Sequence, residues 1–196
     1  TAMMYSTFTS RGIFFFFKQK TAYEIGTGDW SSDVCSSDLA NISLDHYCQT
    51  EPQLKASSIG VHLRHVLDHY TCLLEGLDDG VVDYDQRARD VRIEESTHQA
   101  QLCLKGVVSG LQGLLSKPFE GELQVYMATS SGCVKKGDRL SVAQVSSLER
   151  ELGFLHSHTV HHNASIALLL KLNDVEVLIE KDFGLAPATA HFQEQV

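Results

Sequence analysis

The sequence lacks several features that would assign it to a familiar class of protein. It has no C-x-x-C pair, no internal repeat and no apolar run approaching the roughly 20 residues of a membrane-spanning helix. It also lacks a basic stripe, and its net charge of −9 argues against nucleic acid or an anionic membrane as a partner. Scattered cysteines without a signal peptide are typical of a reducing compartment, so we expect a cytoplasmic protein.

The apolar residues of 21–39 show neither the helical period of 3.6 residues nor the strand period of two. The run Phe14–Phe17 is too short for the apolar region of a signal peptide, and Lys18 and Lys20 follow it instead of preceding it. The segments KQKTAYE (18–24) and DWSSDVCSSD (29–38) are similar to DNA-sequencing adapters translated in one open frame. We therefore expect residues 1–39 to be an extraneous, disordered leader and residues 40–196 to form the domain.

Three segments of the remaining chain have apolar residues at steps of three and four, which predicts helices over 58–76, about 96–115 and 146–172. Ser57 or Ser58 can cap the first, and Ser146 with Glu149 fits a capping box for the third. Weak alternation over 123–128, followed by a turn and 140–142, predicts a small β-hairpin.

These elements favour an all-α fold, a four-helix bundle with a small β-hairpin insertion, because no predicted helix is flanked by parallel strands. A bundle of this kind closes with four helices, and the fourth should precede Ser57. Only 40–47 remains there once the leader is set aside. We therefore expect the first helix to be truncated or replaced by the leader.

Histidines are the most unusual feature of the chain. Of the ten histidines, seven lie in two predicted helices, namely His62, His65, His69, His156, His158, His161 and His162. His158 and His162 are four residues apart on the apolar face of their helix, so their rings can converge. Buried imidazoles need partners, and a shared metal ion satisfies two of them at once.

A third ligand would come from the other histidine-rich helix. Three protein ligands with an open position are the catalytic pattern for a metal site. On a helical wheel His62 and His69 border the apolar stripe while His65 points further round, so periodicity alone favours His62 or His69. The simpler alternatives are core histidines without metal or a cluster that titrates with pH.

Four further residues are candidates for supporting roles. His161 could donate a hydrogen bond near the ligands, or it could be a rim histidine. Glu151 lies seven residues before His158 and could accept a proton from a ligand imidazole, or it could be a first-turn charge favoured by the helix dipole. Arg87 and Arg89 could hold a substrate carboxylate, or they could be solvated loop charges.

The segment SIGVHLRHVLDH (58–69) resembles the second helix of DinB/YfiT-like proteins, and RELGF (150–154) with HTVHH (158–162) resembles their last helix. The resemblance implies a four-helix bundle, often a homodimer, with nickel or zinc on His65, His158 and His162. It implies an enzyme that transfers a low-molecular-weight thiol to an electrophile, or a related hydrolase. The competing hypothesis is a non-catalytic, stress-associated bundle whose metal is structural or absent.

Overall fold

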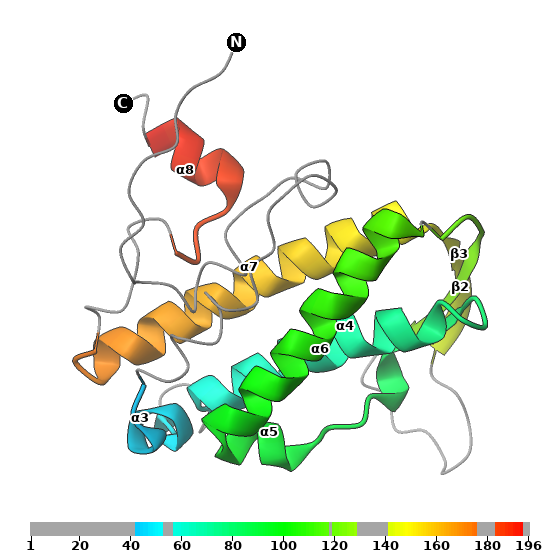
Figure 1. The fold of residues 1–196 in the computed structure, drawn as a ribbon. Coiled ribbons are helices and arrows are strands. Elements are labelled where there is room, and N and C mark those ends of the chain that lie inside the picture. The colour runs from blue at the N-terminus through cyan, green and yellow to red at the C-terminus, as the bar shows by residue number, and fades with distance from the viewer. Residues whose placement is uncertain (1–41, 53–56, 118, 129–140, 176–182, 194–196) are drawn as a thin grey trace.

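The computed structural model describes residues 42–52, 57–117, 119–128, 141–175 and 183–193. The expected leader, residues 1–39, lies outside these ranges. The described part is mostly helical with one small sheet (Figure 1). Its elements are α3 (Leu44–Cys48), α4 (Ile59–Gly76), β1 (Val81–Asp83), η3 (Tyr84–Gln86), α5 (Val91–Glu95), α6 (Thr97–Ser116), β2 (Leu123–Ala128), β3 (Ser141–Ser146), α7 (Leu148–Leu172) and α8 (Pro187–Gln193).

The central element is α4, which packs against α6 and against α7 (Figure 1). It begins where the Ser58 side chain accepts a hydrogen bond from the Val61 amide. Its buried face carries apolar residues at three- and four-residue steps, and these form the core with matching faces of the other two long helices. The members from α4 are Ile59, Leu63, Val66, Leu67, Tyr70 and Leu73.

A three-stranded sheet in the order β1-β2-β3 lies at one end of these helices (Figure 1). The strand β1 follows α4 directly and pairs parallel with β2, whereas β2 and β3 form an antiparallel pair. A parallel pair needs a crossover connection, and α5 with α6 supplies it. The sheet fixes where two other elements begin. The short helix η3 continues directly from β1, and α7 begins one residue after β3.

The structure confirms a mostly helical fold and corrects two details of the sequence-based prediction. The hairpin is part of a three-stranded sheet, because β1, a strand that the sequence analysis did not predict, pairs with β2. The cap of α7 is Ser147 and not Ser146, which ends β3. Before Ser57 the described residues contain only the five-residue α3, so a four-helix bundle remains a prediction.

None of the helices in the described part of the chain combines the length and apolar character needed to cross a membrane.

Glycine at position 60 allows α4 and α5 to approach closely. A Cβ there would collide with the carbonyl oxygen of Glu94 and lie 2.9 Å from a ring carbon of Tyr47. We expect Gly60→Ala to lower the free energy of unfolding by about 1–3 kcal/mol, as overpacking does. Urea denaturation measures this change.

The matched control for that substitution is Gly106→Ala in the middle of α6. A Cβ at Gly106 meets nothing within 4 Å, so the higher helix propensity of alanine should raise the free energy of unfolding by about 0.5–1 kcal/mol. Equal and small effects at both positions would contradict the close packing of α4 on α5.

Candidate metal centre

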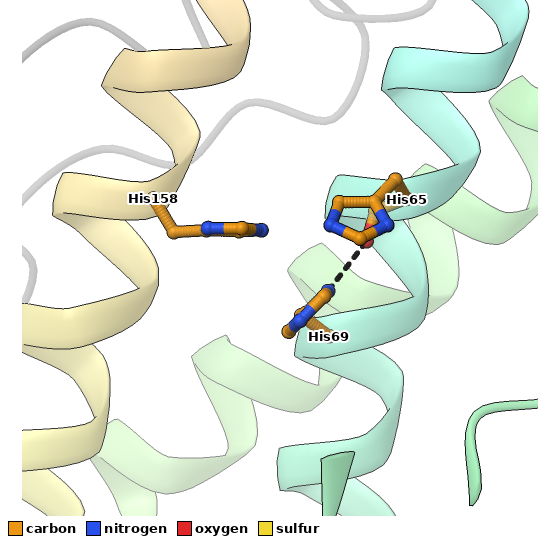
Figure 2. Close-up of side chains that lie close together, drawn as sticks. All are labelled: His65, His69 and His158. Atoms are coloured by element: carbon orange, nitrogen blue, oxygen red, sulfur yellow. Dashed lines mark hydrogen bonds between the residues drawn. The ribbon is translucent and has the colours of Figure 1, made fainter. Parts of the chain in front are cut away.

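Two long helices bring five imidazole rings together. His62, His65 and His69 project from successive turns of α4, and His158 and His162 project from α7. Neighbouring rings have centroids 4.5–5.1 Å apart, in the pairs His62–His162, His65–His69, His65–His158, His65–His162, His69–His158 and His158–His162. Figure 2 shows His158 reaching from α7 towards His65 and His69 on α4.

Three of these residues form a group that could hold a metal ion. His65, His69 and His158 each offer a ring nitrogen, and these nitrogens all lie within 4.8 Å of one another. Imidazole nitrogens suit zinc, copper, iron and nickel. The ring nitrogens of His158 and of two histidines of α4 are thus close enough to contact a single ion, as the sequence analysis expected for His158 and one histidine of that helix.

The predicted ligand His162 lies beside this group. Its ring centroid is 4.6 Å from that of His65 and 4.6 Å from that of His158. Its Nδ1 is 2.8 Å from Nδ1 of His62, whose Nε2 is 3.0 Å from the hydroxyl of Ser57. One Nδ1 of the pair must carry the proton that they share. If the proton is on His162, its Nε2 keeps a free lone pair.

The ring nitrogens of His69 already have protein partners. Its Nδ1 donates to the carbonyl of His65 at 2.7 Å, shown by the dashed line in Figure 2. Its Nε2 therefore carries the lone pair, and it accepts from Nη1 of Arg87 at 3.1 Å. A metal ion on His69 would have to replace this contact with Arg87.

His65 and His158 differ from His69 in this respect. Among the described residues the His65 ring has no hydrogen-bond partner. The Nε2 atom of His158 is buried and likewise lacks a partner in the described part of the chain. A buried polar atom without a partner costs free energy, and a metal ion is one way to satisfy it. Distance alone selects His69 as the third ligand, whereas hydrogen bonding leaves His162 more available.

The environment keeps these imidazoles neutral. Burial is the main cause that lowers the pKa of His65, His69 and His162 to about 3, and neighbouring histidines lower it further. Arg87 adds to the lowering for His65 and His69. Burial likewise lowers the pKa of His62 and His158. Neutral imidazoles carry the lone pairs that a divalent cation requires, so the donor set fits a metal ion at neutral pH.

An aromatic wall, Tyr84 and Phe154, lines one side of the cluster. The ring of Tyr84 stacks on His69 with centroids 5.4 Å apart, and Phe154 stacks on His158 at 5.6 Å. Sequence analysis missed both residues. Phe154 had a usable signal, since it precedes His158 by four residues on the same helical face.

Glu151 lies behind this wall and not beside the ligands. It is fully buried and accepts hydrogen bonds from Tyr84, Ser146 and Arg150, at 2.9, 2.5 and 2.7 Å respectively. Among the described residues it has no histidine partner, so it does not accept a proton from a ligand imidazole. It fixes Tyr84, which in turn stacks on His69.

The remaining candidates separate into two groups. Arg87 is half-buried and contacts the cluster through His69. Arg89 is exposed and takes a left-handed backbone conformation with φ 51°. His161 is also exposed, with its ring 5.2 Å from that of His162, which fits a rim histidine.

No family model matches the chain, and neither a curated protein nor a solved structure matches it.

Proposed function

We propose that this chain is a divalent-metal-dependent enzyme whose ion is held by His65, His158 and His162. The observation that carries the proposal is the buried, unpartnered Nε2 of His158, aimed across the helix interface at a second histidine-rich helix. His65 has no competing hydrogen bond among the described residues, and His62 can accept the Nδ1 proton of His162. Ligand histidines commonly donate their other N–H in this way.

His69 has a different role in this proposal. Its contact with Arg87 keeps its lone pair occupied and leaves the metal with three protein ligands. Three ligands with an open position favour catalysis, whereas a fourth histidine would close the site and favour a structural metal. The support for an open position is that His161 is exposed and Glu151 is engaged elsewhere.

The reaction class follows the resemblance to DinB/YfiT-like proteins, which implies transfer of a low-molecular-weight thiol or a related hydrolysis. A divalent ion, when bound, lowers the pKa of a water or thiol at its open position. The chain's own Cys72 is a poor nucleophile, because burial raises its pKa to about 11 and its thiol donates to the Asp83 carbonyl. Burial also raises the pKa of Cys48 and Cys103, so none of the described cysteines is an activated thiol, and we assign the reactive thiol to a small molecule.

Cobalt substitution tests the open position. We expect 2-mercaptoethanol to produce a thiolate-to-cobalt charge-transfer band in cobalt-loaded protein, and ethylene glycol, its oxygen analogue, to produce none. The visible cobalt spectrum measures whether the metal stays bound during the titration. Retained cobalt without a thiolate band would contradict the enzyme and favour the competing hypothesis of a closed, structural site.

A further inference from the structure

Arg87 is a half-buried cation without a carboxylate partner in the described part of the chain. The other arginines that approach carboxylates have definite pairs, namely Arg64 with Asp68 and Glu94, Arg92 with Asp90, and Arg150 with Glu151. Arg87 instead uses Nη1 to contact His69 and the Tyr84 carbonyl. A charge partly removed from water is stabilised by an anionic partner, so the free edge of this guanidinium favours an anion.

The unused edge of the guanidinium has a defined shape. The Nε atom of Arg87 is buried and has no hydrogen-bond partner, and Nη2 has none among the described residues. In a planar guanidinium the Nε–H and one Nη2–H point in the same direction, because Nη1 lies on the side of Cδ. This pair of parallel donors matches the two oxygens of a carboxylate.

No carboxylate among the described residues forms an ion pair with Arg87. Asp68 bonds to Arg64 at 2.7 Å. Asp68 and Asp85 attract the charge of Arg87 from further away and only partly offset it. Burial lowers the pKa of Arg87, with repulsion from Arg89 as the next cause, which agrees with an incompletely compensated cation. A metal ion among the histidines would add further positive charge beside it.

We propose that Arg87 binds the carboxylate of a small-molecule substrate along its Nε–Nη2 edge, beside the metal centre. His69 separates the two sites, since its Nε2 contacts Arg87 and its ring is 4.5 Å from those of His65 and His158. The carboxylate would thus orient the substrate towards the metal's open position. The assignment as substrate rests on the proposed function, whereas the anion site is formed by Arg87 alone.

The residues that flank Arg87 explain why it and not Arg89 is suited to this role. Tyr84 is fully buried and anchored by Glu151, so its carbonyl holds the guanidinium in place. Arg89 is exposed, and no ion pair or hydrogen bond of its side chain is described. A preorganised fork loses less entropy on binding than a mobile side chain does.

The test is an acetate titration followed by the Nε–H resonance of Arg87 in a nitrogen–proton NMR spectrum, with and without zinc. The resonance is identified by its loss in Arg87→Lys. We expect a saturable shift with acetate and none with acetamide, the neutral analogue. Calorimetry should show acetate binding weakened about tenfold or more in Arg87→Lys, which keeps the charge but loses the paired donors.

The control is Lys105→Gln, which removes one positive charge from an exposed position on α6 and should leave acetate affinity unchanged. An unshifted Nε–H resonance, or equal affinity in Arg87→Lys and the wild type, would overturn the proposal. Tighter binding of inorganic phosphate than of acetate at equal ionic strength would overturn the carboxylate assignment. If zinc binds but acetate does not shift the Nε–H resonance, this inference is wrong and the proposed function stands. If acetate shifts the resonance but zinc does not bind, the proposed function is wrong and the anion site stands.

Discussion

Replacing His158 with alanine is expected to abolish high-affinity binding of a divalent cation. His158 is the residue of α7 in the group with His65 and His69, and its buried Nε2 has no other partner in the described part of the chain. Removing a residue that hydrogen-bonds to a metal ligand commonly weakens metal binding about 10–100-fold, so removing the ligand itself should weaken it more. Zinc titration against a chromophoric chelator measures the affinity.

The matched control for this substitution is His156→Ala on the same helix. The His156 ring makes no contact with another histidine among the described residues, although its Nε2 is also buried without a partner. We expect unchanged zinc affinity in that variant. Zinc affinity in His158→Ala equal to that of the wild type would show that the cluster is not a metal site.

A second pair of variants separates the two possible third ligands. If His162 is the ligand, His162→Ala should lose affinity as strongly as His158→Ala, while His69→Ala should lose much less. A larger loss of zinc affinity in His69→Ala than in His162→Ala would mean that the metal displaces Arg87 from His69, as the distances among His65, His69 and His158 allow.

Replacing Glu151 with alanine is expected to cause a large loss of stability, lowering the free energy of unfolding by about 3 kcal/mol. The carboxylate is fully buried and is the acceptor for Tyr84 and Ser146, whose hydroxyls would be left without it. Arg150 contributes less to the loss because its side chain is 54% exposed and can turn to solvent. Urea denaturation of the metal-free protein measures the change.

Two further variants check the origin of this effect. Glu149→Ala removes an exposed charge from the same first turn of α7 and should change stability by less than about 0.5 kcal/mol. Glu151→Gln keeps the shape and one acceptor oxygen, so its loss should be intermediate. A stability of Glu151→Ala equal to that of Glu149→Ala would contradict the buried network.

Much of the histidine cluster could be predicted from spacing alone. Residues three and four apart on a helix share a face, which brings His158 and His162 together and places His62, His65 and His69 on neighbouring turns of α4. The sequence could not rank the histidines of α4. Which ring nitrogen remains available depends on partners such as Ser57 and Arg87, and packing alone decides where those lie.

The sheet illustrates the same limit. The strand β1 has only three residues, and its pairing with β2 is formed across more than 40 positions of the chain. That pairing places Tyr84, one of the two residues of the aromatic wall, and Arg87 against the cluster. Long-range pairing of short strands leaves little periodic signal in a sequence.

The most direct measurement is X-ray absorption spectroscopy of the zinc-loaded protein, prepared without an affinity tag. The account predicts a single zinc ion surrounded by three imidazole nitrogens at about 2.0–2.1 Å and one exchangeable light ligand, with this signal absent from His158→Ala. A zinc ion coordinated by oxygen alone, or the same imidazole signal in His158→Ala, would contradict it.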